Sequence, residues 1–329
     1  MINFIINFIS NKEIILYEKH RQTMPLVSNT FNRKRFWFIP IGIIWKYIPF
    51  KTTDKRKHKI MYFILNCVQP KYILSMNWIS KRESLYKVWT TKNTNSKFMV
   101  VQHGVYTGGI VRDIPHKYIK SDIFLTWGSF FVEQFKAYNS LKKVEIVNFG
   151  NSIYNTFNRK EFEYRKYNSD KVLLLPTALD EKDILLFYNL IDRLKDLNFL
   201  LVVKPHNKQG KEKDEKDNLK YPNIEGVNII TGDLYSILQN NEFDFIVSDH
   251  SSSLLDAIFF KNKVIYFDPN NSINGYTTQY SKYLANLYSQ DYSKLDRGFF
   301  EGFINIENQE ALLSEMVRIG NNQIDSYLS

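Results

Sequence analysis

The chain has 329 residues, more than one hydrophobic core usually organises, so two domains of about 150 residues each are expected, and 25 Phe, 21 Tyr and 5 Trp exclude a disordered chain. The formal net charge of +10 favours anionic partners, but the basic residues are spread without a clustered face, so no nucleic-acid partner is expected. Cys67 is the single cysteine, which excludes an internal disulfide and fits a cytoplasmic protein.

The aromatic opening of the chain contains the membrane signals. Met1–Ser10 lacks a basic start and a small-residue cleavage site, so we do not expect a secretory signal. Phe36–Phe50 is apolar, but Lys46 and two prolines interrupt it, and it is shorter than the about 20 residues of a spanning helix. The basic run Lys51–Lys59 follows. Aromatic residues beside cations suit an anionic membrane surface, whereas the alternative is a buried segment followed by a solvated loop.

From Lys71 onward, short apolar runs alternate with helical patterns, as in βα units. We expect a first Rossmann-like domain over residues 1–157, built on an open parallel sheet. Its expected strands are Tyr72–Met76, Phe98–Gln102, Ile123–Thr126 and Val144–Val147, and its expected helices are Lys81–Thr91 and Phe130–Tyr138.

A polar stretch, residues 158–171, is expected to be a linker because it has little apolar periodicity. A second doubly wound α/β domain is expected over residues 172–305, and residues 306–329 are expected to form helices that pack back on the first domain. The expected strands are Val172–Leu175, Phe199–Val203, Asn228–Ile230, Asp244–Val247 and Val264–Phe267, and the expected helices are Glu181–Leu197, Leu234–Gln239, Ser252–Phe260 and Gln309–Ile319.

Several common signatures are missing from the sequence. Neither half contains G-x-G-x-x-G or G-x-x-x-x-G-K-[ST], which disfavours NAD and Walker-type ATP chemistry. The zinc-protease motif H-E-x-x-H, the zinc motif C-x-x-C and the hydrolase motif G-x-S-x-G do not occur either.

The segment "FIVSDHSSSLLDAIFF" predicts an anion site. A buried strand ends at Ser248, and an apolar helix containing Asp256 follows a polar turn. Hydroxyls and helix N-terminal N–H groups at one place can hold a phosphate or diphosphate, whereas the alternative is a single serine that caps the helix. The turn consists of Asp249, His250, Ser251, Ser252 and Ser253.

Two histidines follow strands, one in each half of the chain. "VVQHG" places Gln102, His103 and Gly104 after one strand, and "VVKPH" places Lys204 and His206 after another. Because open α/β folds bind ligands at the carboxyl edge of the sheet, both histidines are candidate catalytic residues facing a central cleft between the domains.

In its order of motifs, the stretch from Val100 to Asp268 resembles the bacterial CDP-glycerol glycerophosphotransferases and related GT-B enzymes of cell-surface polymer synthesis. The segments that carry the resemblance are "QHG", "DIFLTWGSFFVEQF", "VEIVNFGNSIYN", "KPH" and "SDHSSSLLDAIFFKNKVIYFD". The resemblance implies a GT-B fold of two Rossmann-like domains, the first on the acceptor side and the second binding the nucleotide donor.

The resemblance also implies roles for individual residues. His103 would be the general base on the acceptor hydroxyl, and His206 would contact the donor phosphate or assist the leaving group. Ser251–Ser253 would hold the diphosphate beside Lys204, with Gln102, Gly104, Asp249, His250 and Asp256 in support. Hydroxyls, N–H groups and cations can neutralise a departing phosphate, so no metal or other cofactor is expected.

The expected function is transfer of a sugar from an NDP- or CMP-linked donor to a glycan or lipid-linked acceptor of a capsule, lipopolysaccharide or teichoic-acid-like polymer. Transfer of a polyol phosphate from a CDP-polyol is the alternative, although "GVYTGG" after His103 departs from the glycerophosphotransferase pattern. A sugar-nucleotide 2-epimerase is a more remote alternative, and a membrane-associated scaffold is the non-enzymatic one. The expected location is cytoplasmic, at the inner face of the membrane.

Overall fold

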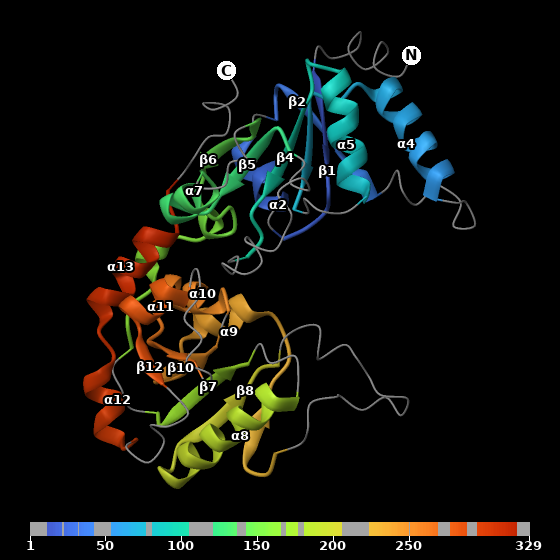
Figure 1. The fold of residues 1–329 in the computed structure, drawn as a ribbon. Coiled ribbons are helices and arrows are strands. Elements are labelled where there is room, and N and C mark those ends of the chain that lie inside the picture. Colours follow the sequence, from blue (N-terminus) through green and yellow to red (C-terminus); the bar gives the residue numbers. More distant parts are fainter. Residues whose placement is uncertain are drawn as a thin grey trace. The chain divides into compact units, whose positions relative to one another are not determined.

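The computed structural model describes residues 12–21, 23–31, 33–42, 54–76, 81–104, 121–136, 143–165, 169–176, 181–205, 224–249, 251–268, 277–287 and 295–320. The chain divides into two compact units. Unit 1 comprises Met1–His103, Asp113–Phe157 and Ser314–Ser329, and unit 2 comprises Gly104–Arg112 and Asn158–Leu313. Each unit is built around one sheet (Figure 1).

Sheet A of unit 1 has six parallel strands in the order β2-β1-β3-β4-β5-β6. Strand addition changes direction between β1 and β3, so this pair forms the topological switch point of the sheet. The strands are β1 (Glu13–Tyr17), β2 (Phe36–Pro40), β3 (Tyr72–Ser75), β4 (Lys97–Val101), β5 (Ile123–Thr126) and β6 (Glu145–Asn148).

The strands of sheet A are apolar on both faces because both faces are covered. One face packs Ile15, Leu74 and Met99 against Phe31 and the short turns α2 (Thr23–Pro25) and η1 (Leu26–Thr30). On the other face, Phe98 meets Tyr86 and Phe124 meets Phe135 edge-on. The helices of this part of the chain are α4 (Asp54–Val68), α5 (Lys81–Lys92) and α7 (Ser129–Lys136), followed by the turn η4 (Tyr154–Thr156).

Sheet B of unit 2 also has six parallel strands, in the order β12-β11-β10-β7-β8-β9, and its switch point lies between β7 and β10. The strands are β7 (Lys171–Leu175), β8 (Leu200–Val203), β9 (Val227–Ile229), β10 (Phe245–Ser248), β11 (Val264–Phe267) and β12 (Ala285–Leu287). Two parallel sheets with interleaved helices confirm the predicted α/β class.

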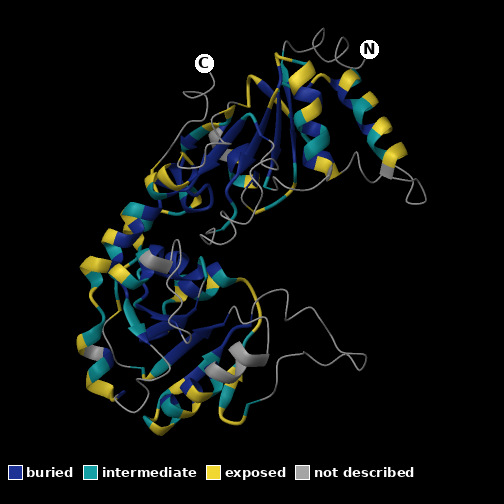
Figure 2. Cartoon of the chain, viewed as in Figure 1, coloured by how far each residue is buried: buried dark blue, intermediate teal, exposed yellow. Residues whose placement is uncertain are grey.

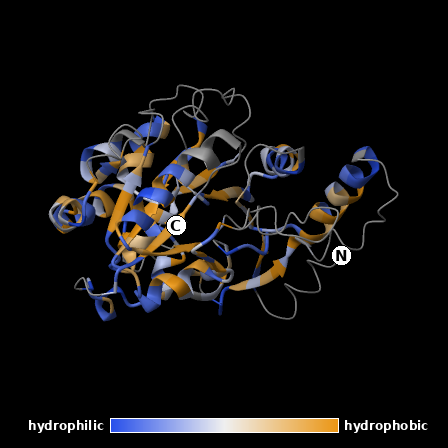
Figure 3. Cartoon of the chain, turned by 90° about the horizontal axis from the view of Figure 1, so that it is seen from below, coloured by the Kyte–Doolittle hydropathy of each residue, from blue (hydrophilic) through white to orange (hydrophobic). Residues whose placement is uncertain are grey.

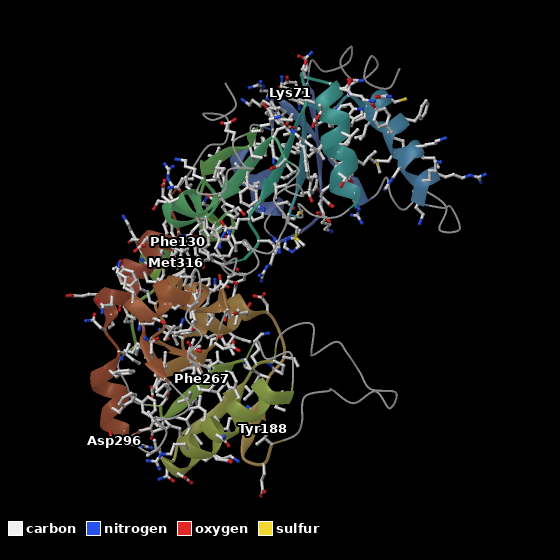
Figure 4. The ribbon with its side chains drawn as sticks, viewed as in Figure 1. Lys71, Phe130, Tyr188, Phe267, Asp296 and Met316 are labelled. Carbon is white, nitrogen blue, oxygen red and sulfur yellow. The ribbon has the colours of Figure 1, made fainter. Side chains whose placement is uncertain are left out.

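The core of unit 2 joins alternate strand residues to helices. Phe267, labelled in Figure 4, contacts Phe187 at 4.7 Å between ring centroids, and Phe245 stacks on Phe300. The buried strands and apolar interiors are visible in Figures 2 and 3. The helices are α8 (Glu181–Asp196), α9 (Leu234–Asn240), α10 (Ser253–Phe259), α11 (Thr277–Tyr283), α12 (Arg297–Phe303) and α13 (Ile306–Met316), with the turn η5 (Arg159–Glu161) before β7.

The opening of the chain differs from expectation. The sequence pattern predicts no strand there, whereas β1 and β2 pair side by side in sheet A. The basic run is not a solvated loop throughout, because residues 54–59 form the start of α4. Cations in a first helical turn oppose the helix dipole, so the sequence pattern did not indicate a helix start.

The polar stretch expected to be a linker packs against unit 2. Arg159 donates hydrogen bonds to the carbonyls of Ile258 and Phe259 at the end of α10, and Phe162 contacts Phe260 at 5.1 Å. Glu310 of α13 accepts a bidentate hydrogen bond from Arg159, at 2.7 Å for both oxygens. The division between the two units falls between Phe157 and Asn158.

The segment after α13 belongs to unit 1, where it lies on α7 and the ends of β5 and β6. The backbone N–H of Arg318 donates to the Trp127 carbonyl at 2.7 Å, and its guanidinium donates to the Asn148 carbonyl at 3.0 Å. Figure 4 shows Phe130 of α7 beside Met316. A Cβ on Gly128 would overlap the Met316 carbonyl, so only glycine permits this approach.

Candidate functional site

The carboxyl edge of sheet A presents the first histidine motif. Gln102 is fully buried directly after β4, and its side-chain oxygen accepts a hydrogen bond from the Trp127 backbone N–H at 2.8 Å. The Trp127 indole N–H donates to the Gln102 carbonyl at 2.9 Å. These two bonds fix the end of β4 to the end of β5, so the half-buried His103 follows a rigid position. Within the described residues, a Cβ on Gly104 would meet no atom within 4 Å.

A second histidine, which was not predicted as a site residue, follows a strand at the carboxyl edge of sheet A. His20 follows β1, and Glu18 directly after β1 bonds to the last residue of β3 through the Ser75 hydroxyl, which donates to Oε2 at 2.7 Å. The sequence contains a signal for His20, because "IILYEKH" ends an apolar run in polar residues and a histidine, as "VVQHG" and "VVKPH" do. It was overlooked because β1 itself was not assigned.

The serine turn of unit 2 lies at the switch point of sheet B. Ser248 ends β10, and its hydroxyl donates to the Leu175 carbonyl at the end of β7 at 2.6 Å. The turn that follows is closed by the Ser251 N–H, which donates to the Asp249 carbonyl at 2.6 Å. The turn therefore occupies the position where Rossmann-type sheets hold their ligands.

The three serines are not equivalent. Ser253 is buried, and its hydroxyl contacts the Ser248 hydroxyl at 3.3 Å. The Ser251 hydroxyl accepts a hydrogen bond from the Ser253 N–H at 3.1 Å, so it uses one helix N-terminal donor internally. The half-buried Ser252 makes no side-chain capping bond at the start of α10. The three hydroxyls therefore have different surroundings, and their expected contacts with a diphosphate stay a prediction.

The supporting residues of this edge are buried. Lys204 follows β8 at the same level as Leu175 and is 7% exposed. Asp249 and Asp256 are also buried, and the Tyr235 hydroxyl donates to Asp256 at 3.3 Å. The Tyr280 hydroxyl of α11 donates to the Ser251 carbonyl at 2.9 Å and so holds the turn in place. A buried ammonium near this turn is suited to an anion.

Two of the predicted site residues, His206 and His250, lie outside the described residues. Their roles stay predictions. No group of three or more His, Cys, Asp or Glu residues in the described part of the chain is arranged to hold a metal ion.

A hollow of about 570 Å³ lies at the opposite, amino edge of sheet B. Because its lining is largely apolar and lies away from the carboxyl edge, it does not belong to the candidate site. Its lining includes Leu200, Val202, Val227, Ile237 and Phe243.

The α4 surface combines cations with exposed apolar side chains. Lys55, Arg56 and Lys59 are exposed on α4, as are Ile60 at 36% and Phe63 at 67%. Arg56, Lys59, Ile60 and Phe63 lie three or four residues apart, so their side chains share one helical face. Within the described residues, none of these three cations has an ion-pair partner. Among the helices that the structure describes, none is long and apolar enough to cross a membrane.

Comparisons with known proteins identify the fold. No family model and no curated protein matches the sequence. A putative UDP-N-acetylglucosamine 2-epimerase from Listeria monocytogenes matches with a TM-score of 0.60 and 12% identity, covering 96% of this chain and 94% of that one. The UDP complex of S. aureus MnaA matches with a TM-score of 0.58, 11% identity and the same coverages.

The wall teichoic acid polymerase TagF, in a histidine variant, matches with a TM-score of 0.54 and 11% identity over 96% of this chain and 87% of that one. The chain has the GT-B fold. The fold prediction is thereby confirmed, and structural neighbours include the polymerase class that the sequence motifs resemble.

Proposed function

We propose that the protein is a GT-B glycosyltransferase that moves a sugar from a nucleotide-activated donor to a cell-surface glycan. The observation that supports this function most directly is the polar turn at the β7–β10 switch point of unit 2, with buried Lys204 on the neighbouring strand β8. A negatively charged diphosphate at this edge would meet an ammonium and the serine turn rather than apolar surface.

In this proposal, unit 2 holds the donor. Ser252 and the Ser251–Ser252 backbone contact the diphosphate, Lys204 balances its charge, and His206 assists the leaving nucleotide. Ser253 supports the turn through Ser248 instead of contacting the donor. Because these groups supply the electrostatic stabilisation, the reaction needs no metal, and activity is expected to survive excess EDTA.

Unit 1 supplies the base. His103 accepts the proton of the acceptor hydroxyl as that oxygen attacks the anomeric carbon of the donor sugar and the nucleotide diphosphate leaves. The Gln102–Trp127 pair fixes the strand end that presents the imidazole. Imidazole is the side chain that most often takes up a proton in this kind of step.

Two other reactions on the same fold have support from the structural neighbours. TagF was solved after a soak with CDPG, and an epimerase from Neisseria meningitidis was solved bound to UDP-GlcNAc. Transfer of a polyol phosphate from a CDP-polyol is therefore the second candidate. Epimerisation of a sugar nucleotide is the third, and it would proceed without an acceptor.

A donor panel distinguishes these reactions. Thermal shift of the full chain with UDP-, GDP-, CMP- and dTDP-sugars, CDP-glycerol and CDP-ribitol is expected to show stabilisation by an NDP- or CMP-sugar. Ser252→Ala should weaken that binding by about 1–3 kcal/mol, and Ser28→Ala, an exposed hydroxyl of unit 1, should not. Conversion of the donor sugar without an acceptor would establish the epimerase, and no nucleotide-dependent shift would contradict the proposal.

The cellular placement belongs to the same proposal. The α4 surface binds the anionic inner face of the cell membrane, where lipid-linked acceptors are found. Lys55, Arg56 and Lys59, all exposed, would each add about 1 kcal/mol of attraction to an anionic surface, and Phe63 can insert at the headgroup level.

A further inference from the structure

The β1–β3 switch point of unit 1 contains a polar cluster that the reaction described so far does not use. Glu18 and His20 follow β1, Ser75 ends β3, and Glu83 of α5 is 1% exposed beside them. The Ser75 hydroxyl is 2.7 Å from a Glu18 oxygen and 3.4 Å from a Glu83 oxygen. Ligands of open α/β sheets bind at such a point, just outside the carboxyl ends of the strands.

The turn after β1 is held in one conformation. The Thr23 hydroxyl accepts a hydrogen bond from the His20 N–H at 3.1 Å and lies within bonding distance of the Glu18 carbonyl. The backbone N–H groups of Thr23 and Met24 both donate to the His20 carbonyl. Because Thr23 is fully buried, this turn fixes His20 and Arg21 at the edge of the sheet.

Strand register places His103 near this cluster. Tyr17, Leu74 and Met99 lie at one level across β1, β3 and β4. His20 lies three residues beyond this level, after β1, and His103 lies four residues beyond it, after β4. β1 and β4 are the two strands that flank β3. The two flanking strands are about 10 Å apart, which two side chains can span.

Charged groups of both signs meet at this edge. The pKa of His20 lies below its ordinary 6.5 because burial disfavours the imidazolium, and the charges of Arg21 and then His103 act in the same direction. Glu18 acts in the opposite direction and does not outweigh them. Arg82 adds a further cation, 3.6 Å from Glu18, and Glu83 adds the second carboxylate.

We propose that the β1–β3 edge binds a phosphate group of the acceptor, with Arg21 and His20 as the contacting groups. The inference rests on the proposed transferase function, since it assigns an acceptor subsite to unit 1. Arg21 is exposed and always charged, so it can bind a phosphate bidentately, and His20 takes up a proton as the anion arrives. Glu18, which the Ser75 hydroxyl holds in place, can accept hydrogen bonds from hydroxyls beside the phosphate. The ligand class is therefore a phosphate ester of a sugar or polyol.

The sign of the coupling gives a direct test. An anion beside His20 stabilises the imidazolium, so phosphate should raise the pKa of His20, and by linkage binding should tighten as the pH falls through that pKa. Histidine-selective NMR of the full chain follows all 6 histidines, and His20→Gln assigns the signal of interest. The probes are inorganic phosphate and glycerol 3-phosphate.

Arg21→Gln is expected to weaken binding of glycerol 3-phosphate about tenfold, the loss of one charge-assisted bond. The matched control is Arg35→Gln, since Arg35 is exposed at the amino edge of the same sheet, 2.9 Å from Glu13. Binding should be unchanged in that control. A His20 signal that titrates identically with and without phosphate overturns the proposal, and so does equal loss in both arginine variants.

A kinetic arm separates the acceptor from the donor. Arg21→Gln should raise the acceptor KM about tenfold and leave the donor KM unchanged. A raised donor KM alone would place the donor's phosphate at this edge and would overturn the acceptor assignment. Failure of the transferase itself is recognised separately, because no nucleotide would then bind unit 2 while the NMR titration of His20 still reports on phosphate.

Discussion

Trp127 donates two hydrogen bonds to Gln102: its backbone N–H to Gln102 Oε1 at 2.8 Å and its indole N–H to the Gln102 carbonyl at 2.9 Å. Both residues are buried, 0% and 1% exposed. Trp127 also accepts the Arg318 backbone N–H. The pair therefore links the residue before His103 to the C-terminal segment of unit 1.

Gln102→Leu should destabilise unit 1 by about 1–3 kcal/mol, because a buried Trp127 N–H loses its acceptor. Urea unfolding followed by Trp fluorescence measures the change. Gln134→Leu, an exposed position on α7, serves as the control. Equal unfolding midpoints for both variants would show that the pair has no structural role.

Gly128→Ala should release the C-terminal segment from unit 1. The new methyl group would overlap the Met316 backbone, and overpacking of this kind costs about 1–3 kcal/mol. Hydrogen exchange of residues 314–320 should become faster. Gly42→Ala is the control, since no described atom lies within 4 Å of its Cβ position. Unchanged exchange in Gly128→Ala would contradict the close approach.

Glu310→Gln should destabilise unit 2 in a pH-dependent way. Burial alone would raise the pKa of Glu310, but hydrogen bonds from Lys261, Tyr164 and Arg159 outweigh it and hold the pKa below 4.5. Folding therefore stabilises the charged form of Glu310. This stability is present above pH 4.5 and is lost as the pH falls through the lower folded pKa.

The difference in unfolding free energy between wild type and Glu310→Gln should therefore be largest near neutral pH and shrink below pH 4.5. Urea titrations between pH 3 and 7 test this (about two points per pH unit suffice). A constant difference over that range would mean that the Glu310 charge does not contribute.

Much of the fold could be predicted from short apolar runs that end in polar residues. Ile123–Thr126 and Val264–Phe267 were predicted with their observed bounds. β1 and β2 were not predicted because aromatic residues dominate the chain opening, and Phe36 of β2 packs against Tyr72 of β3, which is distant in sequence. Local patterning does not encode such long-range packing.

The candidate site was predictable to a lesser degree. Strand-end residues such as His103 and Lys204 follow from sequence position, since carboxyl ends of parallel strands meet at one edge. The inward turn of Ser253 toward Ser248 depends on the β7–β10 pairing, which no local motif specifies. The position of His20 could not be predicted for the same reason. It lies at the carboxyl edge of sheet A because β1 pairs with β3, and a local motif does not specify that pairing.

The α4 surface should bind anionic vesicles. Full chain mixed with vesicles of phosphatidylcholine and phosphatidylglycerol should co-sediment, and binding should fall with salt because it depends on charge. Lys55→Gln with Lys59→Gln should weaken binding, and Phe63→Ala should do so without changing the salt dependence. Lys97→Gln, an exposed cation at the start of β4, is the control. Equal binding to neutral and anionic vesicles would show that the α4 cations do not contribute and would contradict the proposed anionic surface.

His103→Ala and Lys204→Met should fail in different ways. A general base typically contributes about 10²–10⁴-fold, so His103→Ala should lower kcat by that factor while donor affinity stays near wild type. Lys204 is 7% exposed at the donor edge, so its variant should weaken nucleotide binding as well as the rate. Circular dichroism in the near-UV, which reports on the Trp127 environment, verifies that His103→Ala keeps the β4–β5 junction. If a folded His103→Ala retains full transfer activity, the base lies elsewhere, and Asp113 and His116, outside the described residues, are the next variants to measure.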